Sequence, residues 1–263
     1  MLKKSLLILI VVSLGLFAVS CGKRKQKYPD GSDKVSEYAT INSVKQVFLA
    51  MDDALAGNIA LAAKASYSVK EGDALASAYA WGRLCADAMA AIQAQNSGKL
   101  QTVYAQFVKI APMLSLSEEA GLFEQRAKEL LRKRGWKDLE ILMSGFRSTV
   151  EVKLLDAEKN DLYTLMALGE WAEVTSLGAA ELGKAPNASQ SVMLRQSEAW
   201  ENLAGNLALL TNNPEADPAF AKAETAVRDL LKLLQAMPEA DLSAEQLAAV
   251  SAAGVRIHNV FQP

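Results

Sequence analysis

The sequence predicts an all-α protein, built as an antiparallel array or bundle of helices. Hydrophobic residues make up 51% of the chain but aromatic residues only 6%, so alanine, leucine and valine carry the apolar content and favour close helix contacts. Apolar residues recur every three or four positions through most of the chain, and glycine, proline and asparagine interrupt these runs. No stretch alternates as a strand would.

Nine helices are expected in the body. The first covers residues 41–62, where apolar residues from Ile41 to Ala62 form one helical stripe. The others are expected at 73–96, 99–113, 117–134, 136–158, 161–183, 188–211, 217–236 and 243–260. Gly135 and Pro238 mark ends of helices, whereas Asp217 before a proline and Ser243 mark starts.

A weak internal similarity has an offset of 87 residues. It aligns Leu75, Ala80 and Gly82 with Leu162, Ala167 and Gly169, in two apolar helices that also carry Trp81 and Trp171. The sequence predicts one helical domain over residues 35–263. The similarity adds the alternative that this domain contains two related four-helix halves, 73–158 and 161–260, behind a leading helix.

The N-terminus has the three parts of an export signal. Lys3 and Lys4 supply positive charge, an apolar run extends over residues 6–19, and the small residues before Cys21 end it. The ending Ala18-Val19-Ser20-Cys21 resembles the lipobox of bacterial lipoproteins. This resemblance implies that diacylglycerol is attached to Cys21 through a thioether and that residues 1–20 are removed as a signal peptide.

The alternative is an uncleaved membrane anchor. The uncharged stretch from Ser5 to Gly22 has 18 residues, near the lower limit for crossing a bilayer. Four basic residues then follow closely: Lys23, Arg24, Lys25 and Lys27. A retained anchor would place them on the outer side, against the usual distribution of positive charge. Cleavage is therefore the expected outcome.

Residues 21–34 are expected to form the lipidated cysteine and a flexible linker, because they are polar and include Pro29 and Gly31. Several acyl chains on Cys21 would anchor the protein at a membrane. The basic residues of the linker either contact anionic headgroups or belong to a solvated tether. In the lipoproteins it resembles, an aspartate after the cysteine retains the protein at the inner membrane, so Gly22 favours the periplasmic face of the outer membrane.

Charge and cysteine content exclude two kinds of interaction. The chain has 28 basic and 30 acidic residues, a net charge of −2, which gives no general reason to bind nucleic acid. With Cys21 lipidated, Cys85 has no partner for a disulfide within the chain. In its alanine-rich run, Cys85 is expected to be a small buried hydrophobic residue.

The sequence predicts no enzymatic activity and no cofactor. Its single histidine, His258, lies near the C-terminus, where a surface or half-buried position is expected. One histidine cannot form a metal site that needs several imidazoles, and no CxxC, HExxH, GxSxG or P-loop spacing occurs.

Two acids in one helix allow a catalytic alternative. Glu170 and Glu173 lie three residues apart beside Trp171, so they could form an acid pair next to an aromatic side chain that stacks on a sugar. Acids at this spacing usually lie on a solvated face of a helix. The solvated stripe is the expected arrangement.

Two glycines inside apolar helices favour a close helix crossing. Gly82 and Gly169 each destabilise their helix by about 1 kcal/mol relative to alanine, and a close approach of two helices would offset this. The alternative is a ligand cleft lined by Trp81, Gly82, Gly169 and Trp171.

The expected function is that of a membrane-anchored envelope lipoprotein that acts as a non-catalytic interaction or scaffold module. Its expected partners are the membrane, through Cys21, and a protein of the envelope. The alternative is a lipoprotein that binds a small molecule or a cell-wall fragment in a cleft near Trp81 and Trp171.

Overall fold

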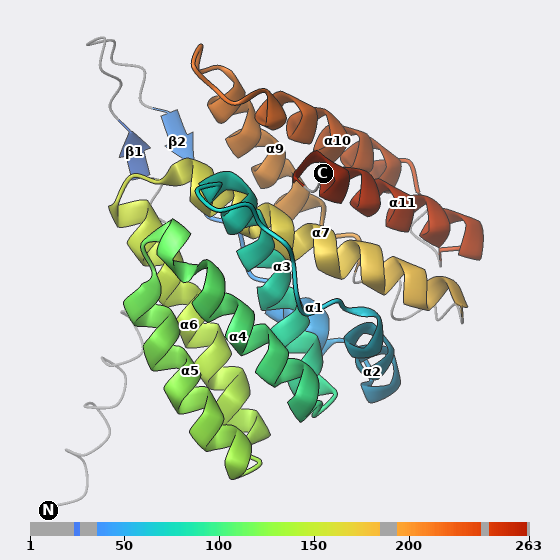
Figure 1. Ribbon diagram of the computed structural model, residues 1–263. Helices are drawn as coiled ribbons and strands as arrows, with labels where there is room; N and C mark the ends of the chain where they lie inside the picture. Colours follow the sequence, from blue (N-terminus) through green and yellow to red (C-terminus); the bar gives the residue numbers. More distant parts are fainter. Residues whose placement is uncertain (1–23, 27–35, 185–193, 238–241, 262–263) are drawn as a thin grey trace, which may run out of the picture. The chain divides into compact units, whose positions relative to one another are not determined.

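In the computed structural model the described residues are 24–26, 36–184, 194–237 and 242–261 (Figure 1). The chain divides into two units, residues 1–40 and residues 41–263. Cys21, the predicted signal peptide and most of the predicted linker lie outside the described residues. Lipidation and export therefore stay predictions.

The first unit contains one short antiparallel pair of strands. β1, Arg24–Gln26, pairs with β2, Ser36–Tyr38, in a register that places Lys25 opposite Glu37. The sequence predicts a linker over 21–34, so the strand at 24–26 is a difference. An alternating pattern cannot be recognised in three residues. The backbones of two such short strands can also pair without an apolar face, so the sequence carries no signal for them.

The second unit is all-α, as predicted: its described residues form ten helices. These are α1 (Lys45–Leu49), α2 (Asp53–Ala62), α3 (Ala74–Gln93), α4 (Ser97–Leu114), α5 (Ser117–Arg132), α6 (Trp136–Asp156), α7 (Asn160–Lys184), α9 (Ser197–Thr211), α10 (Pro218–Gln235) and α11 (Ala244–Phe261). They pack against one another as a multi-helix array around one hydrophobic core.

The expected first helix, 41–62, is wrong in its continuity. The chain enters α1 only at Lys45, and a break separates α1 from α2. The side chain of Asp52 accepts a hydrogen bond from the backbone N–H of Leu55 at 2.8 Å, so this aspartate caps a new helix. The apolar stripe is still buried, since Phe48 and Ile59 both lie in the core.

Two predicted helix starts are confirmed by their caps. Asp217 accepts from the N–H of Ala219 at 2.8 Å, with Pro218 in the first turn. Ser243 accepts from the N–H of Gln246, and the Gln246 side chain accepts from the N–H of Ser243, which is a reciprocal capping box. The helix expected over 188–211 begins at Ser197 instead, and residues 185–193 lie outside the described part.

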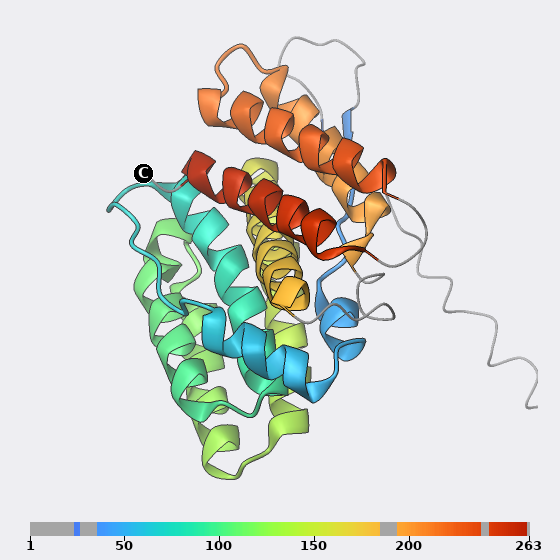
Figure 2. The same ribbon diagram turned by 90° about the vertical axis from the view of Figure 1, so that its right-hand side faces the viewer.

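The described helices after α2 form two sets of four with the same pattern of contacts. In the first set, α3 to α6, each helix packs on the next and α3 also contacts α6. In the second, α7 and α9 to α11, each described helix again packs on the next and α7 contacts α11; these are the yellow, orange and red helices of Figure 2. Whether the two sets are related in sequence stays a prediction.

The two sets meet where α3 and α7 cross, and the predicted close crossing at the glycines is confirmed. A Cβ atom on Gly82 would lie 1.8 Å from the carbonyl oxygen of Met166, and one on Gly169 would lie 2.1 Å from that of Tyr79. Each glycine thus faces the residue three positions before the other glycine. The two backbones touch, and this contact brings the charged residues of both helices together.

Candidate functional site

The candidate site lies along α7, which carries Glu170 and Glu173 one turn apart. Both are only 2% exposed, so the prediction of a solvated stripe is wrong. α7 is covered by α3, α6 and α11, and no face of its middle turns is left for solvent. Each acid is instead paired with an arginine from a different helix.

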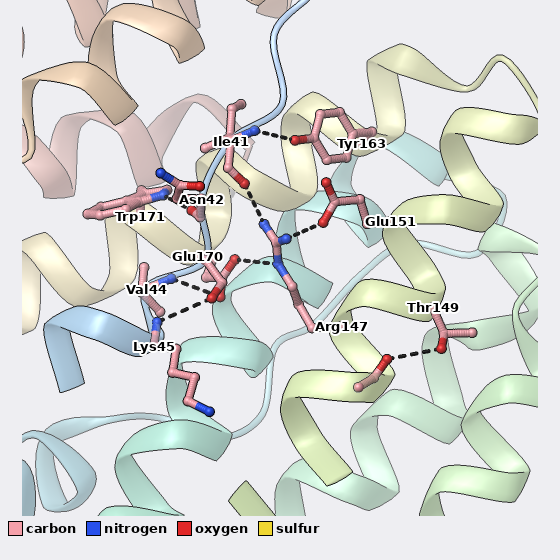
Figure 3. Close-up of polar contacts among 12 residues, drawn as sticks. Ile41, Asn42, Val44, Lys45, Arg147, Thr149, Glu151, Tyr163, Glu170 and Trp171 are labelled. Carbon is pink, nitrogen blue, oxygen red and sulfur yellow. Dashed lines mark hydrogen bonds and ion pairs between the residues drawn. The ribbon is translucent and has the colours of Figure 1, made fainter. Parts of the chain in front are cut away.

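Glu170 belongs to a group that we call the junction cluster, shown in Figure 3: Tyr163, Arg147, Glu151 and Glu170. Arg147 of α6 donates from Nε to Glu170 Oε2 at 3.3 Å and from Nη1 to Glu151. Its Nη2 donates to the carbonyl oxygen of Ile41 at 3.0 Å. One guanidinium therefore joins α6, α7 and the segment before α1.

The junction cluster fixes the backbone of the segment that precedes α1. The N–H of Ile41 donates to Tyr163 Oη at 2.6 Å, and the N–H of Val44 donates to Glu170 Oε1 at 3.4 Å. Trp171 Nε1 donates to the carbonyl oxygen of Asn42 at 2.8 Å. Buried backbone groups need such partners when no regular structure supplies them. Side chains of α6 and α7 supply them here (Figure 3).

The ion pair of this cluster is retained despite burial. Burial lowers the pKa of Arg147, but the charges of Glu170 and Glu151 raise it by more than burial lowers it, so the net shift is upward. Burial raises the pKa of Glu170 while Arg147 opposes the rise. Arg147 is therefore a permanent cation between two carboxyl groups.

Glu173 belongs to a second group, the core cluster: Tyr67, Tyr79, Arg83, Asp87, Glu173 and His258. Arg83 of α3 donates from Nε to Glu173 Oε2. Its guanidinium carbon also lies 3.9 Å from the centroid of the Tyr67 ring, a favourable cation–π contact. The segment between α2 and α3 thus reaches the cluster through Tyr67.

Three oxygens of the core cluster share one phenol proton. Tyr67 Oη lies 2.7 Å from Asp87 Oδ2 and 3.1 Å from Glu173 Oε1, but a phenol has a single proton to donate. Burial, followed by the charge of Glu173, raises the pKa of Asp87 to about 7. Among the described residues, Asp87 Oδ1 and Arg83 Nη1 have no hydrogen-bond partner.

His258 is buried in the core cluster, so the expected surface or half-buried position is wrong. Tyr79 Oη lies 2.7 Å from Nδ1, while Ser176 Oγ and Glu173 Oε2 lie 3.0 Å and 3.3 Å from Nε2. Burial, followed by Arg83, lowers the pKa of His258 to about 3. The imidazole is neutral, and we assign the proton to Nε2 because the Tyr79 hydroxyl can donate to Nδ1.

The tryptophans of the predicted ligand cleft contact different helices. The Trp81 ring is fully buried, with its centroid 4.7 Å from that of Phe107 and 5.6 Å from that of Phe146. The Trp171 ring is also buried and lies 6.3 Å from that of Trp200. A cleft lined by both rings would require these contacts to open, and it stays a prediction.

Sequence reasoning missed the partners of the acids, above all Arg83, Asp87 and Arg147. One signal was present. Arg83 and Asp87 stand one turn apart in an alanine-rich helix of low charge, and a charged residue is rarely buried unless it is paired. Such isolated charges indicate an internal partner but do not say which residue it is.

Three further observations concern the possible classes of protein. Within the described residues, no helix combines the length and the apolar character needed to cross a membrane. Over the same residues, no group of three or more histidine, cysteine or acidic side chains is placed to bind a metal ion. Comparison of the chain with protein families, with curated proteins and with solved structures gave no match.

Proposed function

We propose that this chain is a lipid-anchored protein of the bacterial envelope whose helical body acts as a non-catalytic interaction module. The anchor follows from the lipobox-like ending at Cys21. The junction cluster is the observation that carries the proposal. It binds Ile41 to Val44, the first residues of the body after the N-terminal unit, which is where a tether would have to be fixed.

The absence of catalysis is supported by the surroundings of the three candidate general acids and bases. Glu170, Glu173 and His258 are buried, and each is bound by side chains or backbone of the same chain. A general acid or base has to lie within hydrogen-bond distance of the substrate atom that gains or loses the proton. In both clusters these groups hold helices together instead.

A protein partner is supported by apolar side chains on the surface of α5 and α6. Leu122 is 58% exposed, Ile141 59% and Val152 52%. Single exposed apolar residues are common, but three on two neighbouring helices favour contact with another protein. An envelope protein is the partner that a lipid-anchored body would meet.

The anchor is tested by mass spectrometry of the full-length protein made in a bacterium that processes lipoproteins. We expect an N-terminal peptide that begins at Cys21 and carries acyl mass. The Cys21→Ser variant is the control and should keep residues 1–20. A wild-type peptide that begins at Met1, or a Cys21 thiol without acyl mass, would contradict the proposal.

The interaction is tested by a photo-crosslinking residue at position 141, with position 222 on the exposed side of α10 as the control. We expect one envelope protein to be recovered reproducibly from position 141 and not from position 222. Recovery of no partner from either position, together with turnover of a defined substrate, would show that the body is not an interaction module.

A further inference from the structure

Three sulfur-containing side chains of α3 and α6 line one cavity. Trp81, Cys85 and Met89 follow at intervals of four residues and so lie along one face of α3. The contact of Trp81 with Phe146 sets the register between the two helices. Met143 lies one turn before Phe146 on α6, which places it opposite Cys85 and Met89.

These side chains line a cavity of about 80 Å³. Its walls are Ser43, Lys45, Cys85, Met89, Met143, Ser144, Arg147, Ser148 and Glu170. Cys85, Met89 and Met143 are all buried, and the Cys85 thiol is free. We call these three residues the sulfur pocket.

The positions of α7 that the offset of 87 residues aligns with Cys85 and Met89 carry no sulfur. With the offset of 87 residues, Ala172 and Ser176 on α7 correspond to Cys85 and Met89 on α3. A Cβ atom on Gly254 of α11 would lie only 2.7 Å from the Cβ of Ser176. The α7–α11 contact is therefore closed by small residues, whereas the α3–α6 contact keeps three larger side chains around a space.

The charges around the sulfur pocket favour a cation. Lys45, Arg147 and Glu170 line the cavity, Lys45 is paired with Glu140, and Arg147 is also paired with Glu151, so two positive and three negative groups are present. Burial, followed by Glu170, raises the pKa of the Cys85 thiol. A cation that replaces the thiol proton would neutralise the charge of the buried thiolate.

We propose that Cys85, Met89 and Met143 bind one soft monovalent cation of the Cu(I) class. Thiolate and thioether sulfurs are the ligands that such ions prefer. The Cys85 thiol loses its proton to solvent as its sulfur bonds to the ion, and the two methionine sulfurs each donate a lone pair. No electron is transferred, and one proton is released for each ion bound. This site does not depend on the proposed function.

Silver, as Ag(I), is a redox-stable probe for this site. We would titrate it into the full-length Cys21→Ser chain, in which Cys85 is the one thiol, and count bound ions by native mass spectrometry. We expect one Ag(I) per chain, and no comparable binding of Zn(II). Cys85→Ser should abolish binding, whereas Met89→Leu and Met143→Leu should each weaken it at least about tenfold.

Met51→Leu is the matched control, because Met51 is buried in the core but does not line the cavity; its affinity for Ag(I) should equal that of the parent chain. Circular dichroism establishes that each variant is folded. Absence of Ag(I) binding by the parent chain would overturn the proposal. So would unchanged affinity in the folded Met89→Leu/Met143→Leu double variant, since the thiol alone would then bind the ion.

Discussion

The junction cluster and the core cluster begin from equivalent positions and end in different chemistry. Glu170 directly follows the crossing glycine Gly169 on α7, and Arg83 directly follows the crossing glycine Gly82 on α3. Each pairs with a residue of opposite charge on another helix. The same place in the two halves thus carries opposite charges, and each charge is neutralised by a helix of the other half.

The two clusters differ in how the second acid is accommodated. In the junction cluster the second acid, Glu151, has a side chain that is 12% exposed. In the core cluster the second acid, Asp87, is 0% exposed, and one of its oxygens has no partner among the described residues. Burial of the second acid is the main reason that the pKa of Asp87 is raised to about 7.

Gly82→Ala should have the largest effect, because it would break both clusters at once. The new methyl group would meet the backbone of α7, which cannot move aside as a side chain can, so we expect destabilisation of at least about 3 kcal/mol. Urea denaturation measures this. Gly121→Ala is the control: no atom lies within 4 Å of its Cβ position, and we expect about 0.5–1 kcal/mol of stabilisation. Equal effects of the two variants would disprove the close crossing.

Arg147→Met and Arg83→Met should separate the clusters. Each leaves a buried carboxylate without its cation, which typically destabilises a protein by about 3–5 kcal/mol. Hydrogen exchange should distinguish them, with faster exchange at Val44 in Arg147→Met and at Ala65 in Arg83→Met, because these N–H groups donate to Glu170 and Asp87. Adding Glu170→Gln should restore stability to Arg147→Met. The same exchange pattern in both arginine variants would show that the clusters are not independent.

The pH dependence of stability should reveal two opposing contributions from the core cluster. Asp87 has a raised pKa in the folded state, so its contribution is full below about pH 4 and is lost as the pH rises to about 7. His258 has a lowered pKa, so its contribution is full above about pH 6.5 and is lost as the pH falls towards 3. Each corresponds to a slope of at most about 1.4 kcal/mol per pH unit.

Two variants separate these contributions in denaturation curves measured from pH 4 to pH 6.5. Relative to wild type, the stability of Asp87→Asn should rise with pH, because the opposing aspartate has been removed. That of His258→Gln should fall with pH for the converse reason. If both variants parallel the wild type, neither group titrates as described.

Tyr67→Phe should have the smallest effect and tests the shared proton. The ring can remain over Arg83, but the hydroxyl that donates to Asp87 or Glu173 is lost, so we expect destabilisation of about 1–2 kcal/mol. The pKa of Asp87 should rise further, because the hydrogen bond from Tyr67 lowers it. Carboxyl titration by NMR measures this shift. Tyr163→Phe, the junction counterpart, should leave the pKa of Asp87 unchanged, and a shift there would contradict the separation.

The sequence determined the secondary structure with few errors, because helical spacing and capping residues act within a few positions along the chain. The capping pair Ser243 and Gln246 and the crossing glycines Gly82 and Gly169 can all be recognised from the order of residues alone. The break before α2 cannot, because the apolar stripe continues through it, whereas the side chain of Asp52 caps the start of a new helix.

Only the tertiary structure decided which polar residues are buried and with what partners. Glu170 and Glu173 show the spacing of a solvated face, yet α3, α6 and α11 cover them. The partner of Glu173 is Arg83, 90 residues away, and His258 reaches the same cluster from near the end of the chain. Periodicity reports on neighbours within one helix, whereas the burial of a charge depends on helices that come together only when the chain folds.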